Sequence, residues 1–172
     1  MKGKIVFVIG GAKSGKSSFA LDRAQSLSGR KAYIATAEPL DDEMKERIEK
    51  HKRQRGEDWD TFEEPLHIDL VLKKMSDDYS VVIIDCLTLW LSNLLLGKEN
   101  SEAKMNDLVS SLKNCSGQTI FVVSNEVGMG IVPDNALSRM FRDLAGTVNQ
   151  KMAELADEVY LVTAGIPIRI KP

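Results

Sequence analysis

Short apolar runs rich in β-branched residues alternate along the chain with longer stretches in which apolar residues recur every three or four positions. Several of the short runs are apolar at nearly every position, which is typical of strands covered on both faces. The pattern predicts strands at 5–9, 31–36, 81–85, 119–124 and 158–163, with a further candidate strand at 168–170.

Helices are predicted between these strands, at about 16–27, at 41–55, after Asp85, and at about 135–156. The longest shows the clearest helical periodicity, with apolar residues at three- and four-residue steps from Leu137 to Leu155. Alternating strands and helices predict a mostly parallel sheet with helices on both faces. No repeat or Pro/Ser-rich linker divides the 172 residues, so one α/β domain spanning 1–172 is expected.

The charged residues nearly balance, with 23 Lys and Arg against 25 Asp and Glu and a net charge of −2. A protein that coats nucleic acid or a membrane surface needs a cationic excess, so neither partner is expected. Cys86 and Cys115 are too few for a disulfide framework, which favours a reduced, cytoplasmic setting. The apolar runs at 5–9 and 81–96 are too short or too interrupted for a secretory leader or a membrane span.

A phosphate-binding motif follows the first predicted strand. Residues 10–17 satisfy G-x-x-x-x-G-K-[ST] between a strand and a helix, which is the context that the motif requires. Its glycines let backbone N–H groups face a phosphate, and the helix presents its positive N-terminal end. Lys16 offers a charge to the β- and γ-phosphates, and Ser17 offers a hydroxyl to Mg²⁺. A glycine-rich turn that matches by chance is the alternative, and binding of a nucleoside triphosphate is the favoured interpretation.

Ligands of open parallel sheets bind beyond the carboxyl ends of the strands, and Asp85 stands at such an end. A carboxylate there can reach the metal or its water shell. An apolar strand that ends in Asp is common, however, and a helix cap is the alternative role. The phosphate-binding motif favours the Mg²⁺ role. Asn125 and Glu126 follow the fourth predicted strand and are expected to approach the same crevice.

A histidine lies among basic residues in the predicted helix at 41–55. Arg47, His51 and Arg55 are spaced four residues apart and share one face, with Met44 and Ile48 close to it. One interpretation is a solvated helix whose histidine is satisfied on a thin apolar stripe. The other is an imidazole between guanidinium groups that grip a polyphosphate, where a neutral ring nitrogen attacks phosphorus and forms a phosphoramidate.

The stretch 59–65 is predicted to be a polar loop that carries aromatic residues. Trp59 is a candidate for stacking on a base, and Glu63 for accepting a hydrogen bond from a purine edge or a ribose. Core packing of Trp59 and solvation of Glu63 are nearly as good as explanations. His67 has no companion cluster and is expected to be structural.

These motifs together resemble a known family. In order along the chain they are GGAKSGKS at 10–17, YIATA at 33–37, DDEM at 41–44, RI at 47–48 with His51, WDTFE at 59–63, DCLT at 85–88, SNEVGMGIVP at 124–133, FRDLAG at 141–146 with NQ at 149–150, and ADEV at 156–159. The series resembles the bifunctional adenosylcobinamide kinase / adenosylcobinamide-phosphate guanylyltransferase of cobalamin biosynthesis over essentially the whole chain. The block at 125–133 is far more specific than the phosphate-binding motif.

The resemblance implies phosphorylation of adenosylcobinamide by ATP or GTP. It also implies transfer of GMP from GTP through a guanylylated histidine to give adenosylcobinamide-GDP. His51 matches the family's histidine, while Lys50 stands where some relatives have a second one. A RecA-like P-loop NTPase fold and a homotrimer are implied as well, and the apolar run 87–96 suits either a subunit contact or burial within one chain. The implied nucleotide contacts are Gly10, Gly11, Ala12, Lys13, Ser14, Gly15, Lys16, Ser17, Ala35, Thr36, Ala37, Lys52, Arg53, Gln54, Arg55, Glu63 and Asp85, with catalytic roles for Lys16 and His51 and Mg²⁺ at Ser17 and Asp85.

Two other functions compete with this one. The first is a P-loop kinase of another small alcohol, in which His51 is a bystander. The second is an NTP-dependent switch or binding module that acts on a macromolecule. The near-neutral charge and the lack of a basic, aromatic stripe count against a nucleic-acid partner for such a module.

Overall fold

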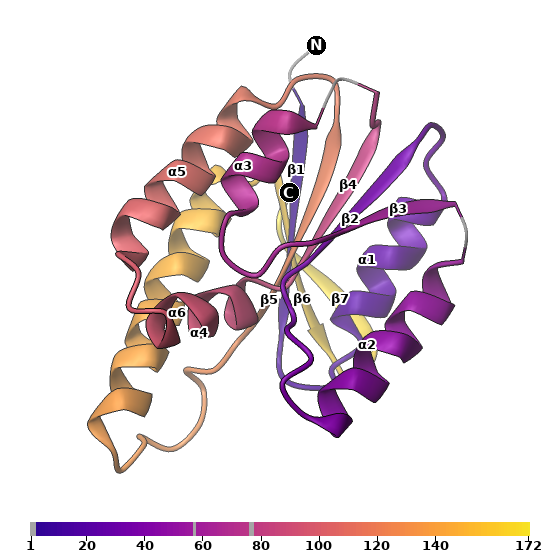
Figure 1. The fold of residues 1–172 in the computed structure, drawn as a ribbon. Coiled ribbons are helices and arrows are strands. Elements are labelled where there is room, and N and C mark those ends of the chain that lie inside the picture. The colour runs from indigo at the N-terminus through magenta and orange to yellow at the C-terminus, as the bar shows by residue number, and fades with distance from the viewer. Residues whose placement is uncertain (1–2, 57, 76–77) are drawn as a thin grey trace.

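One seven-stranded sheet runs through the molecule, in the order β3-β2-β4-β5-β1-β6-β7 (Figure 1). The structure, a computed structural model, describes residues 3–56, 58–75 and 78–172, without the side chains of Arg47 and Gln54. Neighbouring strands from β3 to β6 pair in parallel, and β7 is antiparallel to β6. The strands are β1 (Lys4–Gly10), β2 (Lys31–Ala35), β3 (Trp59–Glu63), β4 (Val81–Asp85), β5 (Thr119–Asn125), β6 (Glu158–Thr163) and β7 (Ile166–Lys171).

Helices lie on both sides of this sheet, which confirms the predicted architecture. In Figure 1, α1 and α2 lie on one side and α3, α4, α5 and α6 on the other. Asp41, Asn100 and Asn135 each accept a hydrogen bond from a first-turn backbone N–H of α2, α5 and α6, so these starts are set by local sequence. The helices are α1 (Lys16–Gln25), α2 (Asp42–Arg55), α3 (Ile68–Lys74), α4 (Leu87–Leu96), α5 (Ser101–Asn114) and α6 (Ala136–Leu155).

Apolar side chains fill both faces of the sheet. Successive residues of a strand point to opposite faces, so Val6 and Val8 pack toward Ala20 and Ala24 of α1, while Phe7 packs on the other face. That other face carries the larger cluster, which includes the buried side chains of α4, α5 and α6. Among the described residues, no helix is long and apolar enough to cross a membrane.

The stretch 59–63 is a strand, so the predicted loop at 59–65 was wrong there. Residues 59–63 pair in parallel with β2, from Lys31 opposite Trp59 to Ala35 opposite Glu63. As an edge strand, β3 has a single buried residue, Trp59, followed by half-buried and exposed positions, and it carries acidic residues, so it lacks the apolar run typical of the central strands. The last strand is also longer than the predicted 168–170, because residues 166–171 pair with β6.

Two helices, α3 and α5, were absent from the prediction. Met105, Leu108 and Leu112 of α5 are buried and recur at three- and four-residue steps, so the signal was present in the sequence. The apolar run 87–96 forms α4. Its residues Leu87, Trp90, Leu91 and Leu94 are buried within this chain, Leu89 and Leu95 are half-buried, and Leu96 is 69% exposed. Of the two roles considered for this run, the structure therefore favours burial within one chain.

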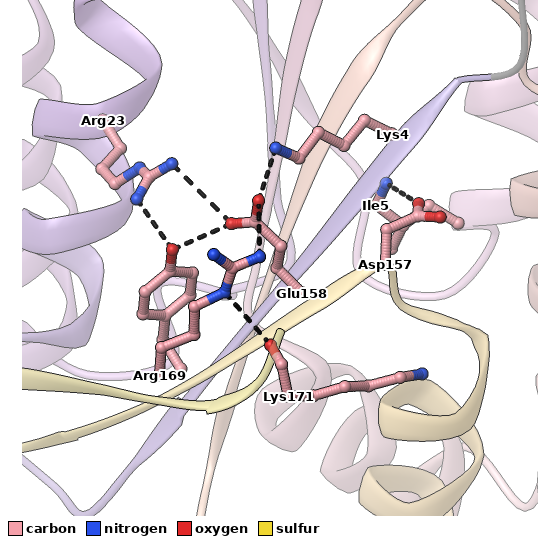
Figure 2. A network of polar contacts seen from close by, with 8 residues as sticks. Lys4, Ile5, Arg23, Asp157, Glu158, Arg169 and Lys171 are labelled. Atoms are coloured by element: carbon pink, nitrogen blue, oxygen red, sulfur yellow. Dashed lines mark hydrogen bonds and ion pairs between the residues drawn. The ribbon is translucent and has the colours of Figure 1, made fainter.

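An ionic network joins both ends of the chain to the sheet (Figure 2). Glu158, at the start of β6, lies 2.6 Å from Lys4 Nζ, 3.2 Å from Arg169 Nη2 and 3.8 Å from Arg23 Nη2. The hydroxyl of Tyr160 donates a further hydrogen bond to Glu158 Oε2 at 2.9 Å. Because the partners come from β1, α1, β6 and β7, one carboxylate holds four elements together.

Glu158→Gln is expected to lower the free energy of unfolding by about 2 kcal/mol near neutral pH, since hydrogen bonds to a charged group are lost. The pKa of Glu158 is lowered, chiefly by the hydrogen bond from Lys4. The stabilisation is therefore complete above the ordinary glutamate pKa and disappears as the pH falls through the lowered value. Urea denaturation should show a smaller difference between wild type and variant at about pH 3 than at about pH 7. A difference that grows on acidification contradicts this account.

Candidate active site

A cavity of about 200 Å³ opens at the carboxyl edge of the sheet. The loop after β1, the ends of β2, β4 and β5, and helices α2 and α4 contribute its walls. Of the residues predicted for the site, Ala12, Lys13, Lys16, Ser17, Ala35, Ala37, His51, Arg55 and Asp85 line it. The structure therefore brings the phosphate-binding motif, the histidine and the carboxylate into one cavity.

The loop at 10–17 is held in place by its own backbone and by the turn between β6 and β7. Lys16 Nζ donates to the carbonyl of Gly11 at 3.0 Å, and Gly165 N–H donates to the carbonyl of Ser14 at 2.8 Å. Helix α1 begins at Lys16, and Lys16 and Ser17 both line the cavity, so the N-terminal end of the helix faces it. This is the arrangement that binds phosphate at a helix N-terminus.

Two glycines of this loop are required by its shape. A Cβ on Gly10 would lie 2.3 Å from the carbonyl oxygen of Val162 and 2.6 Å from Ser14 Oγ, so a side chain there would clash with backbone. Gly15 has a φ of 95°, a left-handed conformation that glycine adopts without strain. The close contact at Gly10 and the left-handed backbone at Gly15 explain why the motif has glycine at these two positions.

Positive charge dominates the cavity. Lys13, Lys16 and Arg55 line it, and Asp85 is the one carboxylate among its described lining residues. Lys16 is only 8% exposed and Arg55 only 5% exposed, so their charges are poorly screened by water. Such a surface attracts a polyanion, and the charge of a triphosphate suits it.

Helix α2 carries His51 to the cavity wall. Met44, Ile48, His51 and Arg55 all line the cavity, which confirms that one face of α2 presents these positions together. The helix has acidic residues in its first turn and basic residues in its last, which complements its dipole. The side chain of Arg47, which was expected on the same face, lies outside the described residues.

Some predicted contacts do not line this cavity. Lys52 and Glu63 lie in an adjacent hollow of about 320 Å³, where Lys52 Nζ is 2.6 Å from Glu63 Oε1. This hydrogen bond raises the pKa of Lys52, which keeps the ammonium charged. Arg53 is exposed, and its Nε donates to the carbonyl of Glu49 at 3.4 Å. The side chain of Gln54 lies outside the described residues.

Thr36 has a structural place beside the site. Its side chain is fully buried, and its hydroxyl donates to the carbonyl of Cys86 and accepts from the N–H of Cys86, both at 2.8 Å. Both functions of the hydroxyl are therefore used in joining the end of β2 to the start of α4. Thr36 is not among the described residues that line the cavity.

Trp59 is part of the core, so its predicted stacking on a base is wrong for this structure. The side chain is 7% exposed, and its indole N–H donates to Gln25 Oε1 at 3.0 Å. Its ring meets the ring of Tyr33 edge-on, with centroids 6.2 Å apart. The core-packing alternative was the correct one.

Asn125 reaches the cavity from the end of β5, as predicted from its place after a strand. A buried polar network holds its backbone: Thr88 Oγ1 accepts from the N–H of Asn125 at 2.7 Å, and Asn149 Nδ2 donates to its carbonyl at 3.1 Å. Ser124 joins the same network by donating to Asn149 Oδ1 at 2.7 Å. Glu126 instead accepts from the N–H of Gly128, which makes it an anchor of the following loop.

Tyr33 lines the cavity but was not predicted as a site residue. Its hydroxyl donates to Asp85 Oδ2 at 2.7 Å, and the guanidinium carbon of Arg55 lies 3.8 Å from its ring centroid. Burial, followed by the charge of Asp85, raises the pKa of Tyr33 well above its usual value, so the hydroxyl keeps the proton that it donates. The available signal was a phenol between Ala32 and Ile34, in the apolar part of the strand at 31–35.

The fold and the cavity define a P-loop nucleotide-binding protein of the RecA-like class. The crystal structure of the RadB recombinase matches with a TM-score of 0.55, covering 93% of this chain and 74% of that chain at 15% identity. The family model for CobU, described as cobinamide kinase / cobinamide phosphate guanyltransferase, matches residues 6–170. The chain belongs to this enzyme family, which confirms the resemblance drawn from its motifs.

Curated relatives match over nearly their full length. The bifunctional adenosylcobalamin biosynthesis proteins CobU of Escherichia coli and of Salmonella typhimurium are each 40% identical over 185 aligned positions, covering 97% of this chain and 99% of the relative. The bifunctional adenosylcobalamin biosynthesis protein CobP of Pseudomonas aeruginosa is 39% identical, covering 95% of both chains. The similarity therefore extends across the whole fold and both sides of the cavity.

The thiol of Cys86 is expected to resist alkylation despite its place in the cavity wall. Burial, followed by the charge of Asp85, raises the pKa of Cys86 to about 11. At about pH 8, roughly one thiol in a thousand is then ionised, and the thiolate is the reactive form. Peptide mass spectrometry after iodoacetamide treatment should find Cys86 unmodified in native protein and modified in urea. Rapid modification of native Cys86 contradicts the burial described here.

Proposed function

We propose that this chain performs both reactions named by its family. It phosphorylates adenosylcobinamide with ATP or GTP, and it then transfers GMP from GTP through His51 to give adenosylcobinamide-GDP. The observation that carries the proposal is that Lys16, His51 and Asp85 line one cavity. A phosphate-binding loop and a histidine nucleophile therefore have access to the same triphosphate.

In the kinase reaction, the loop at 10–17 holds the triphosphate, and the substrate hydroxyl attacks the γ-phosphorus and releases its proton to water. The loop's N–H groups and Lys16 take up negative charge on the β- and γ-phosphates, so the bond to the leaving nucleoside diphosphate breaks more easily. Catalysis of this kind depends mainly on positioning and charge neutralisation. Lys13 and Arg55 add to the positive charge of the same wall.

In the second reaction, an imidazole nitrogen of His51 uses its lone pair to attack the α-phosphorus of GTP. A P–N bond forms, the bond between the α-phosphorus and the bridging oxygen breaks, and pyrophosphate leaves with that electron pair. A phosphate oxygen of adenosylcobinamide phosphate then attacks the phosphorus of the guanylylated histidine. A P–O bond forms, the P–N bond breaks, and its electron pair returns to the imidazole nitrogen. Lys16 and Arg55 stabilise the pyrophosphate as it forms.

Mg²⁺ suits the oxygen donors at this site. Ser17 offers a hydroxyl and Asp85 a carboxylate in the same cavity, and Mg²⁺ in such sites takes one or two protein oxygens together with substrate phosphates. Among residues 3–56, 58–75 and 78–172, no group of three or more His, Cys, Asp or Glu side chains could hold a metal unaided, so phosphate oxygens would complete the set. When bound, Mg²⁺ supplies charge neutralisation on the phosphates.

The proposed setting is cytoplasmic, because the cysteines are too few for a disulfide framework, and the proposed assembly is a homotrimer, by family resemblance. An apolar surface is available for contact between copies, because Ile166, Ile168 and Ile170 of edge strand β7 are each at least 47% exposed. The corrinoid, ATP and GTP are the proposed partners.

Incubation with GTP labelled at the α-phosphate tests the histidine role. Wild-type protein should acquire an acid-labile, alkali-stable label, as expected of a phosphoramidate. His51→Ala should acquire none. His67→Ala is the matched control and should be labelled fully, because His67 lies outside the cavity lining with its Nδ1 3.0 Å from Lys104 Nζ.

Label retained by His51→Ala would refute the histidine role. If wild-type protein takes up no label but transfers the γ-phosphoryl group to another small alcohol and not to cobinamide, the chain is the competing P-loop kinase. NTP turnover that instead depends on a macromolecule, with no label, identifies the switch or binding module.

Lys16→Ala is expected to weaken nucleotide binding roughly 10- to 100-fold, because a charge-assisted hydrogen bond is worth about 1.5–3 kcal/mol. Both activities should fall with it. Isothermal titration calorimetry with GTP measures the binding, and Lys113→Ala, at an exposed position of α5, is the control. Kinase turnover that persists unchanged in Lys16→Ala contradicts the role given to this lysine.

A further inference from the structure

Tyr33 contacts two charged residues of the cavity, Asp85 and Arg55. It lies on β2 and is 6% exposed, so its phenol is a core side chain with a polar tip. The hydroxyl donates to Asp85 Oδ2 at 2.7 Å. Against the face of the same ring lies the guanidinium of Arg55, with its central carbon 3.8 Å from the ring centroid. One side chain thus contacts both the carboxylate on β4 and the last residue of α2.

The sheet register explains the contact with Asp85. In the parallel pairing of β2 and β4, Tyr33 is opposite Ile83 and Ala35 is opposite Asp85. Tyr33 and Asp85 therefore lie on the same face of the sheet as diagonal neighbours, a separation that a long side chain can bridge. Phenylalanine would fill the same core space but would leave Asp85 Oδ2 without this donor.

The ring contact with Arg55 links Tyr33 to His51. Arg55 is 5% exposed and lies one helical turn after His51, and both residues line the cavity. A guanidinium over an aromatic ring is attracted by the ring's negative face, and burial strengthens this attraction. The ring of Trp59 packs nearly perpendicular to the tyrosine ring, at 83° and with centroids 6.2 Å apart. The C-terminal turn of α2 is thereby fixed relative to β2 and β4.

We propose that Tyr33 is a positioning residue that acts on both halves of the site. Its hydroxyl holds the Asp85 carboxylate in the orientation needed for Mg²⁺, and its ring seats Arg55 and thereby the turn of α2 that carries His51. The inference rests on the roles proposed above for Asp85 and His51. A residue that only filled the core would contribute to stability and leave metal dependence unchanged.

Tyr33→Phe separates the hydroxyl from the ring. The measurement is binding of α,β-methylene-GTP, which cannot lose pyrophosphate, by calorimetry across a Mg²⁺ titration. Tyr33→Phe should raise the Mg²⁺ concentration for half-maximal enhancement of binding about 10-fold, the usual scale for losing a partner of a metal ligand. Binding without Mg²⁺ should stay at the wild-type value, because Arg55 and the phosphate-binding loop are retained.

Tyr79→Phe is a closely matched control. The Tyr79 hydroxyl also donates to an aspartate, Asp60 Oδ2 at 3.0 Å, and its ring also carries an arginine, with the Arg30 guanidinium carbon 4.6 Å from the centroid. Tyr79 is equally buried, at 7% exposure, but does not line the cavity. This variant should keep the wild-type Mg²⁺ dependence. An equal shift in both variants would show a general structural effect and overturn the proposal.

Asp85→Asn distinguishes failure of this inference from failure of the proposed function. If Asp85→Asn shifts the Mg²⁺ dependence and Tyr33→Phe does not, the inference is wrong and the role of Asp85 stands. If neither variant shifts it, the Mg²⁺ role proposed for Asp85 is wrong and the inference falls with it. A shift in both, with none in Tyr79→Phe, supports the inference.

The ring is tested by Tyr33→Leu, assayed for His51 labelling at saturating Mg²⁺. Leucine removes the surface under Arg55, so labelling should be slower than in Tyr33→Phe by about 5-fold or more, given the strength of a buried cation–π contact. Equal labelling rates in the two variants overturn the role of the ring. If Tyr33→Leu does not fold, comparison of Tyr33→Phe with Tyr79→Phe still decides the role of the hydroxyl.

Discussion

The common direction of β1, β2, β4 and β5 is the constraint on which the site depends. Strands that run in parallel end at the same edge of a sheet, so the residues that end or follow them lie close together at that edge. The phosphate-binding loop follows β1, Asp85 ends β4, and Asn125 ends β5. Residues separated by more than a hundred positions in the chain therefore line one cavity.

Burial gives these groups their chemical character. Lys16 and Arg55 are cations with little exposure to water, and they share a cavity with the carboxylate of Asp85. Charges in such a place act strongly on a polyanion because solvent screens them little. The same burial raises the pKa of both Tyr33 and Cys86, so their hydroxyl and thiol remain neutral beside this carboxylate. In this cavity, Lys16, Arg55 and Asp85 are thus the charged groups, and burial keeps Tyr33 and Cys86 neutral.

Contacts between distant parts of the chain support the elements that carry the cavity. Glu158 ties β1 and α1 to the C-terminal hairpin, whose turn in turn donates from Gly165 to the carbonyl of Ser14. The phosphate-binding loop is therefore braced by the last two strands as well as by its own backbone. The buried network of Thr88, Ser124 and Asn149 does the same for the end of β5. Rigid support of this kind keeps the groups of a site in place before substrate binds.

The local sequence pattern was sufficient to predict the parallel sheet and most of the helices. It also predicted the phosphate-binding loop at 10–17 and the face of α2 that bears His51. Each of these features depends on the spacing of residues that are close together in the sequence. Several other features were decided only by the tertiary structure. It made an edge strand of residues 59–63, placed Trp59 in the core and Thr36 between β2 and α4, and paired Lys52 with Glu63 in a separate hollow. It also put Tyr33 against Asp85 and Arg55. The physical reason is that side-chain partners across strands depend on strand order and register, which are properties of the assembled sheet and not of any local segment.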